Sequence, residues 1–168
     1  MSVVVAVVND NKITVAADSG VYSGWGITPS KNIKISKLEK INDIILGGVG
    51  YAEENLLFFD YMKTHVLDVV DPEHIRQFIK EFLKYKEELY LEKNLNNEYI
   101  LAAKGKCYYI EGMMVSEIIN SWAIGAGKDY ANGALYNNVS AEKAVETAIA
   151  LCAFVGGTIV SETIERKI

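Results

Sequence analysis

The sequence contains little cysteine, proline or histidine, with two residues of each. Cys107 and Cys152 form no CxxC pair and have no neighbouring histidine, which argues against a zinc ribbon or a disulfide-stapled scaffold. We expect both to be buried thiols. The scarcity of proline, together with 50% hydrophobic and 23% charged residues, excludes a disordered chain and indicates an ordinary globular protein.

Long tracts of basic or hydrophobic residues are also missing. Basic residues never occur in runs longer than a pair and the net charge is −5, which argues against a nucleic-acid footprint. No apolar run reaches the roughly 18 residues that a membrane span needs, and the N-terminal MSVVVAVVND lacks the features of a signal peptide. We therefore expect a cytoplasmic protein that binds neither nucleic acid nor a membrane.

The length of 168 residues suits a single domain over 1–168. A chain of this size can bury about 70% of the surface that it exposes when unfolded. Its core therefore needs no metal or disulfide for stability.

The first 50 residues are strand-like. Val3 to Val8 and Lys12 to Ala17 are apolar or β-branched runs separated by Asn9-Asp10-Asn11, which predicts a hairpin. A connection rich in Gly and Ser follows over 18–26. Further short strands are predicted at 33–35 and 41–47.

The hydrophobic period then changes to that of helices. Apolar spacing predicts one helix over 52–67, and Asp71 with Pro72 behind it marks the start of a second helix that runs to about Lys93. Strands, two shorter helices and a last strand follow. The predicted strands are 99–103, 106–110, 114–119, 122–124 and 158–163, and the helices are 129–136 and 140–152.

This order predicts a protein of the α+β class. Two stacked, mainly antiparallel sheets with helices on both outer faces would accommodate it, which is a four-layer αββα sandwich. The hydrophobic periodicity predicts the helices and strands, whereas the four-layer arrangement follows from packing rules alone.

Common catalytic and nucleotide-binding motifs are absent from the sequence. It contains no HExxH, no EF-hand loop, no P-loop and no dinucleotide fingerprint. His65 and His74 both fall on predicted helices, where a solvated histidine is the more ordinary interpretation than a member of a catalytic triad.

The N-terminus offers a nucleophile that needs no histidine. Met1 is followed by the small residue Ser2, which leads directly into a predicted strand, and initiator Met is generally removed before a small residue. Removal would expose a free α-amine beside a hydroxyl. Because the reference pKa of an α-amine is about 8, a useful fraction is unprotonated at neutral pH and can act as general base.

Three segments resemble the β-type proteasome subunits and especially the bacterial HslV-type peptidase. They read SVVVAVVNDNKITVAADSG, KNIKISKLEKINDIILGGVGYAEENLLFFDYMK and WAIGAGKDYANGAL. Counting from Ser2, Asp18 lies 16 positions on and Lys34 a further 16, which is similar to the family's spacing of Thr, Asp and Lys. The strand ILGGVG falls where the family carries its oxyanion-hole glycine, and Gly47 is the best match.

The resemblance implies an N-terminal nucleophile hydrolase that cleaves peptide bonds inside an enclosed chamber. Mapped onto this chain, the Ser2 hydroxyl would attack the scissile carbonyl and the Ser2 α-amine would accept its proton. Lys34 would lower the pKa of the hydroxyl, Asp18 would keep Lys34 charged, and the Gly47 N–H would stabilise the oxyanion. From the residues alone, Asp18 and Lys34 could equally be a structural ion pair, and Gly47 a glycine that permits close strand packing.

The resemblance also implies partners. We expect a homo-oligomeric ring or double ring and a peptide or unfolded protein as substrate, and the resemblance allows an ATP-dependent unfoldase as a further partner. No cofactor is required. A structural monovalent or divalent cation held by backbone carbonyls, as in HslV-type enzymes, would fall around Ile149, Cys152 and Val155.

Two departures from the family pattern leave other functions open. Ala126 stands where the family usually has Ser in its GSG turn, and the nucleophile is Ser rather than Thr, which removes the methyl group that stiffens χ1. The alternatives are a catalytically inactive ring or shell protein, and an amidohydrolase that acts on a small amide.

Overall fold

Two antiparallel sheets form the centre of the molecule. The computed structural model describes residues 1–23, 26–28, 35–89 and 91–166. The first sheet has the strand order β10-β1-β2-β11, and the turn between β1 and β2 closes with a hydrogen bond from Asn9 N–H to the Lys12 carbonyl. Its strands are β1 (Val3–Val8), β2 (Lys12–Asp18), β10 (Ser121–Gly125) and β11 (Ile159–Glu165).

The second sheet has the strand order β5-β6-β7-β8-β9. Asn42 and Asp43 connect its first two strands with φ of 49° and 64°, which are values that a two-residue hairpin turn requires. A separate two-stranded hairpin, β3 (Val21–Ser23) with β4 (Gly26–Thr28), follows β2. The five strands are β5 (Leu38–Ile41), β6 (Ile44–Val49), β7 (Glu98–Ala103), β8 (Lys106–Glu111) and β9 (Met114–Glu117).

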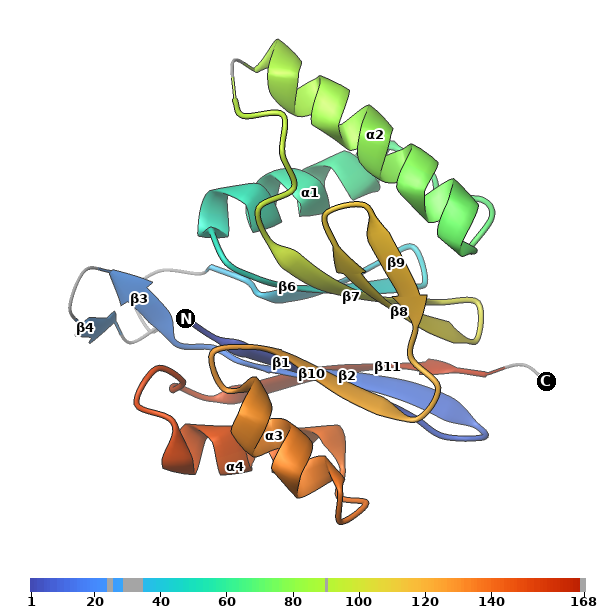
Figure 1. Ribbon diagram of the computed structural model, residues 1–168. Coiled ribbons are helices and arrows are strands. Elements are labelled where there is room, and N and C mark those ends of the chain that lie inside the picture. The colour runs from blue at the N-terminus through green and yellow to red at the C-terminus, as the bar shows by residue number, and fades with distance from the viewer. Residues whose placement is uncertain (24–25, 29–34, 90, 167–168) are drawn as a thin grey trace.

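Within the described part of the chain, four helices cover the outer faces of the two sheets (Figure 1). The helices α1 (Ala52–Thr64) and α2 (Pro72–Glu88) lie over the five-stranded sheet, and α3 (Lys128–Leu135) and α4 (Ala141–Leu151) lie over the four-stranded sheet. Side chains cap two of them. Asp71 accepts hydrogen bonds from the N–H groups of Glu73 and His74, both at 2.9 Å, and Ser140 accepts one from Lys143 N–H at 3.2 Å.

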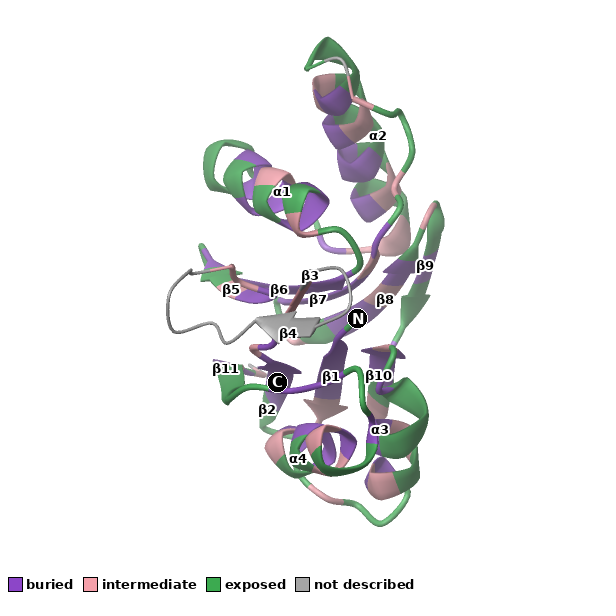
Figure 2. Ribbon diagram, turned by 90° about the vertical axis from the view of Figure 1, so that its left-hand side faces the viewer, coloured by how far each residue is buried: buried purple, intermediate pink, exposed green. Residues whose placement is uncertain are grey.

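Three apolar clusters hold the elements together. The first joins α1 and α2 to the five-stranded sheet, the second lies between the sheets, and the third joins the four-stranded sheet to α3 and α4. Figure 2 shows the matching pattern, in which the buried faces of the helices turn toward the sheets. The mixed class of the fold agrees with the sequence-based prediction.

Several predicted boundaries differ from the observed ones. The strand predicted over 41–47 is divided by the Asn42-Asp43 turn, so that a further strand, β5, ends at Ile41. The helix predicted to end at residue 67 ends at Thr64, because His65 has an extended backbone (φ −124°, ψ 126°), and α2 ends at Glu88 rather than Lys93. The hairpin of β3 and β4 occupies the segment predicted as a connection. Of the strand predicted at 33–35, residues 33 and 34 lie outside the described residues and residue 35 is not in a strand.

The apolar face of α1 packs mainly inside the molecule. Phe58, Phe59 and Met62 are buried in the first cluster, whereas Leu56 is 39% exposed. Ordinary packing on the sheet therefore explains most of this face. Within the described ranges, none of the helices is both long and apolar enough to cross a membrane.

We predict that Phe58→Ala destabilises the protein by about 3–5 kcal/mol, the usual cost of truncating a buried aromatic side chain. The Phe58 ring is 1% exposed and stacks on Phe82 at 4.4 Å between centroids. The measurement is the urea midpoint at constant m-value. Leu56→Ala on the same helix is the matched control, with an expected change of about 0.5 kcal/mol; equal midpoints for the two variants would contradict the prediction.

Candidate active site at the N-terminal strand

Asp18 is the centre of a buried polar cluster at the end of β2. Its side chain is 0% exposed and makes three contacts. Oδ1 accepts a hydrogen bond from the N–H of Val3 at 2.9 Å, and Oδ2 accepts one from Gly156 N–H at 3.2 Å and one from Lys37 Nζ at 2.9 Å. The carboxylate thus joins the start of β1 to two distant segments of the chain.

Lys37 supplies the cation of this cluster. It lies immediately before β5, its side chain is 8% exposed, and its amine pairs with Asp18. Burial lowers the pKa of the Lys37 amine, and the attraction and hydrogen bond of Asp18 oppose that shift. A buried amine next to a buried carboxylate is the kind of arrangement that the sequence predicted around Asp18, and among the described residues Lys37 supplies the amine.

The Lys34 assigned from the family spacing lies outside the described residues. The segment KNIKISK places lysines at 31, 34 and 37, three positions apart, so that spacing alone could not choose among them. The signal that could have found Lys37 is the apolar Leu38 behind it, which begins the strand that the sequence analysis missed.

With Met1 in place, Ser2 is buried next to the Asp18–Lys37 pair. Ser2 is 5% exposed, and its hydroxyl donates a hydrogen bond to the Met1 carbonyl at 2.5 Å. The amino group of Met1 faces Lys37 and Asp18. Its pKa is lowered by burial and by the Lys37 charge, and Asp18 acts in the opposite direction. The N-terminus therefore lies in an environment that favours a neutral amine.

The turn after β10 contacts the backbone of Ser2. Gly127 N–H donates to the Ser2 carbonyl at 3.2 Å, and Gly125 has φ of +91° with its Cα directly against that carbonyl, where a side chain would overlap it. Ala126 stands between them, and its carbonyl accepts a hydrogen bond from Cys152 Sγ at 3.6 Å. The turn fixes the position of residue 2 through main-chain contacts.

Gly47 lies where the two sheets approach each other. A Cβ atom on Gly47 would lie 2.7 Å from Val4 Cγ1, closer than real contacts allow. Gly48 N–H donates to the Lys37 carbonyl at 2.8 Å, and because neighbouring amides of a strand point to opposite edges, the Gly47 amide faces β7. This geometry favours a packing role for Gly47, and its oxyanion role stays a prediction.

The two cysteines lie at different places, and only Cys152 belongs to the predicted cation site. Cys107 is buried in the cluster between the sheets, and burial raises the pKa of its thiol to about 12. At the predicted cation site, the Cys152 carbonyl already accepts a hydrogen bond from Val155 N–H at 3.2 Å. Among the described residues no group of three or more His, Cys, Asp or Glu could hold a metal, and a site of backbone carbonyls at Ile149, Cys152 and Val155 stays a prediction.

The two histidines make local contacts. His65 stacks on Tyr61 with 3.8 Å between ring centroids, and His74 pairs with Asp71 at the start of α2. A cavity of about 890 Å³ lies at the opposite end of β5 and β6, near His65 and Lys104, and none of Ser2, Asp18 and Lys37 lines it. The cluster of Ser2, Asp18 and Lys37 is therefore separate from the histidines and from this cavity.

The whole chain is similar to solved structures of one kind. It matches Thiobacillus denitrificans BPH in complex with epoxomicin with a TM-score of 0.89 at 21% identity, covering 99% of this chain and 100% of the other. The fold is proteasome-like. It also matches Thiobacillus denitrificans BPH with a TM-score of 0.90 at 20% identity, covering 98% of each chain. The match to eukaryotic HslV from Trypanosoma brucei has a TM-score of 0.71 at 19% identity and covers 98% of this chain and 99% of the other.

These likenesses confirm, at the level of the fold, the resemblance to HslV-type proteins seen in the sequence. No protein-family model matches the chain, and no curated protein matches it. At identities near 20%, the comparisons establish the fold, and the function must be argued from the site.

We predict that Asp18→Asn destabilises the protein by about 3–5 kcal/mol, because it leaves the Lys37 ammonium buried without its counter-charge. Loss of Asp18 lowers the pKa of Lys37 further, so the folded variant binds fewer protons than the unfolded chain over a wider pH range. The free energy of unfolding of the variant should then rise with pH, and the difference in unfolding free energy between wild type and variant should become smaller toward alkaline pH. Urea unfolding at a series of pH values measures this.

The double variant Asp18→Asn/Lys37→Met serves as the control for this charge effect. It removes both charges, so its stability deficit should be smaller than that of Asp18→Asn and should not narrow with pH. A deficit of Asp18→Asn that is constant with pH would show that the ammonium is not the source of the cost.

Proposed function

We propose that this chain is an N-terminal nucleophile peptidase that becomes active when Met1 is removed. The observation that carries the proposal is the buried Asp18–Lys37 pair against the first residues of β1. Asp18 already holds the N–H of Val3, so a free α-amine on Ser2 would begin one residue away, beside the Lys37 ammonium. The proteasome-like fold supports a peptidase or a related shell protein.

In the proposed reaction, Ser2 Oγ attacks the carbonyl carbon of the substrate and its proton passes to the Ser2 α-amine, directly or through a water. The tetrahedral intermediate collapses as the C–N bond breaks, and the leaving amine takes that proton from the α-ammonium. Water then attacks the acyl ester, with the α-amine as base again, and releases the acid. The free Ser2 hydroxyl and amine are restored.

Lys37, rather than Lys34, is assigned the electrostatic role. A cation beside the hydroxyl and the amine favours the alkoxide and the free base, since each carries less positive charge than its protonated form. Asp18 keeps this cation in place through a 2.9 Å contact. The oxyanion donor predicted at Gly47 completes the mechanism as a separate hypothesis.

The substrate and the assembly belong to the same proposal. Thiobacillus denitrificans BPH was solved with epoxomicin bound, and that compound is a reasonable first probe here. We propose peptides or unfolded proteins as substrates, a ring or double ring as the assembly, and an ATP-dependent unfoldase as a possible partner, in a cytoplasmic setting. The stacked layers of helix, sheet, sheet and helix are proposed to be the αββα sandwich of the N-terminal nucleophile hydrolases.

We expect Ser2→Ala and Lys37→Met to abolish hydrolysis of short fluorogenic peptides by protein that has lost Met1, with a loss on the order of 10³-fold or more. The control is Lys40→Met, which removes a lysine on β5 whose amine bonds to the Thr163 carbonyl, far from the pair. Lys34→Met tests the assignment made from spacing. Activity that survives Lys37→Met but not Lys34→Met would overturn the assignment of Lys37.

Intact mass separates the peptidase from the inactive shell protein. A mass lacking one Met, followed by a single epoxomicin adduct mapped to Ser2, is the result expected for the peptidase. The shell alternative is favoured by one observation, that Ser2 bonds to the Met1 carbonyl and is nearly inaccessible while Met1 is present. Processed protein that assembles into rings but gives no adduct would establish it.

A further inference from the structure

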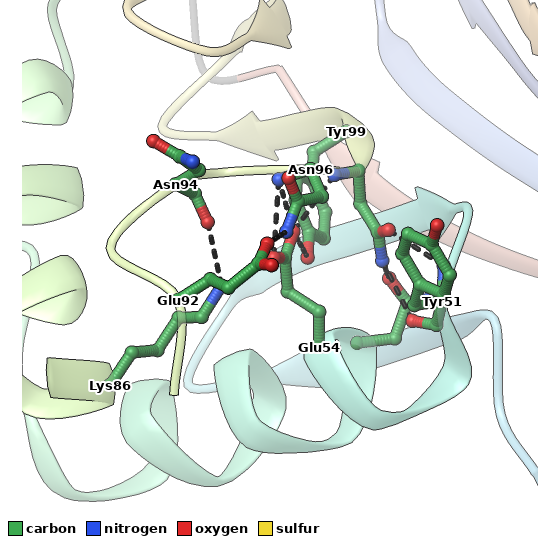
Figure 3. A network of polar contacts seen from close by, with 9 residues as sticks. Tyr51, Glu54, Lys86, Glu92, Asn94, Asn96 and Tyr99 are labelled. Atoms are coloured by element: carbon green, nitrogen blue, oxygen red, sulfur yellow. Dashed lines mark hydrogen bonds and ion pairs between the residues drawn. The ribbon is translucent and has the colours of Figure 1, made fainter. Parts of the chain in front are cut away.

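A second buried polar network links α1, α2 and the segment before β7 (Figure 3). Glu54 Oε2 pairs with Lys86 Nζ at 2.6 Å, and both side chains are about 5% exposed. Glu54 also accepts hydrogen bonds from the N–H groups of Asn96 and Asn97 and from the Tyr99 hydroxyl. The carboxylate is fully engaged, so this ion pair is a structural clamp rather than a free acid or base.

Asn97 extends the network to the turn that follows β6. It is 2% exposed, its Oδ1 accepts the Tyr51 N–H at 2.7 Å, and its Nδ2 donates to the Tyr51 carbonyl and to Asn55 Oδ1, both at 2.8 Å. Gly50 has φ of +131° and lies directly against the Asn97 amide, with no room for a side chain. Asn97 therefore fixes the backbone where β6 turns into α1.

Asn55 carries the network to the candidate active site. It is 3% exposed, and its Nδ2 donates to the Gly48 carbonyl at 2.9 Å. The orientation of the Asn55 amide is determined by its partners, because the Gly48 carbonyl only accepts and Asn97 Nδ2 only donates. Gly48 in turn donates its N–H to the Lys37 carbonyl at 2.8 Å.

The contacts of Gly48 with Asn55 and Lys37 lie at the end of the hydrogen-bond ladder between β5 and β6. Leu38 pairs with Gly47, and Lys37 is the residue at which β5 leaves β6. The Gly48 N–H holds the Lys37 carbonyl, and the Gly48 carbonyl is held by the Asn55 side chain of α1. A shift of Gly48 would therefore move the backbone of Lys37, and with it the amine that pairs with Asp18.

We propose that Asn55 is a positioning residue: by holding Gly48, it sets the position of the Lys37 amine beside the N-terminal residue. An effect of Asn55 on catalysis rests on the proposed function. Its effect on the position of the Lys37 charge beside the N-terminal amine does not, and holds whether or not the chain is a peptidase.

The test compares Asn55→Ala with the wild type in two measurements. The first is the pH dependence of acetylation of the N-terminal amine by trace acetic anhydride, read by peptide mass spectrometry in chains that retain Met1. Among the described residues, the charged groups that face this amine are Lys37 and Asp18. When the Lys37 ammonium moves away, the amine loses the neighbour that lowers its pKa, so the labelling midpoint should shift to higher pH.

The second measurement is the rate at which epoxomicin forms an adduct on Ser2 in processed protein. Asn55→Ala should slow it about 10- to 100-fold, the cost of misplacing a group that acts on the nucleophile. Asn94→Ala is the matched control. Asn94 lies in the same network through its backbone carbonyl alone, which accepts from Lys86 at 2.6 Å, so its side chain can be removed without touching Gly48.

The outcomes are distinguishable. An unchanged amine midpoint in folded Asn55→Ala, with only a lower melting temperature, would overturn the proposal and leave Asn55 a purely structural residue. If Asn55→Ala does not fold, Asn55→Leu, which refills the space without a donor, takes its place with the same expected shift. No adduct on wild-type Ser2 would refute the peptidase, and the amine midpoint would still decide the role of Asn55.

Discussion

The buried contact between Asp18 and Lys37 is the constraint on which the N-terminal half of the structure depends. Two opposite charges leave water together, and their attraction offsets that cost only when the remaining hydrogen-bonding capacity is filled. Here the carboxylate also receives the N–H groups of Val3 and Gly156, so three segments separated along the chain converge on one side chain. An ion pair retained at such a cost is better explained by what it positions than by net stability.

The sheets explain how this convergence is possible. Asp18 ends β2, Val3 begins β1, and the two strands are neighbours in the four-stranded sheet, whereas Lys37 leads into the other sheet. The pair thus joins the two sheets at one end of the molecule, while Gly47 lets them approach through its contact with Val4. The buried Glu54–Lys86 pair performs a similar function between the helices, and the two pairs are connected through Asn55 and Gly48.

Much of the fold could be predicted from the sequence because its strongest signals are local. The β-branched runs of β1 and β2 and the Asp71-Pro72 helix start required no tertiary information. The start of β5 was missed although its signal is local too: Asn42-Asp43 is a polar turn pair between Ile41 and Ile44, and the predicted strand ran through it. A spacing measured along the chain could not single out Lys37, because lysines recur at positions 31, 34 and 37; the role predicted for Lys34, which lies outside the described residues, stays a prediction.

The buried polar residues of α1 were also beyond prediction. Glu54 and Asn55 resemble ordinary surface residues at the start of a helix, and only the fold brings Lys86 and Asn97 against them. Hydrophobic periodicity predicts the face that a helix buries, but it does not reveal that a polar residue on that face has a partner 32 or 42 positions away.

The location of Cys107 limits the reaction of its thiol with electrophiles. A thiolate is ordinarily the nucleophile that competes most strongly with a serine for a covalent reagent. Cys107 is enclosed between the sheets with its thiol pKa raised to about 12, so almost none of it is thiolate at neutral pH and reagents cannot reach it. The same enclosure keeps peroxide from the Cys107 sulfur.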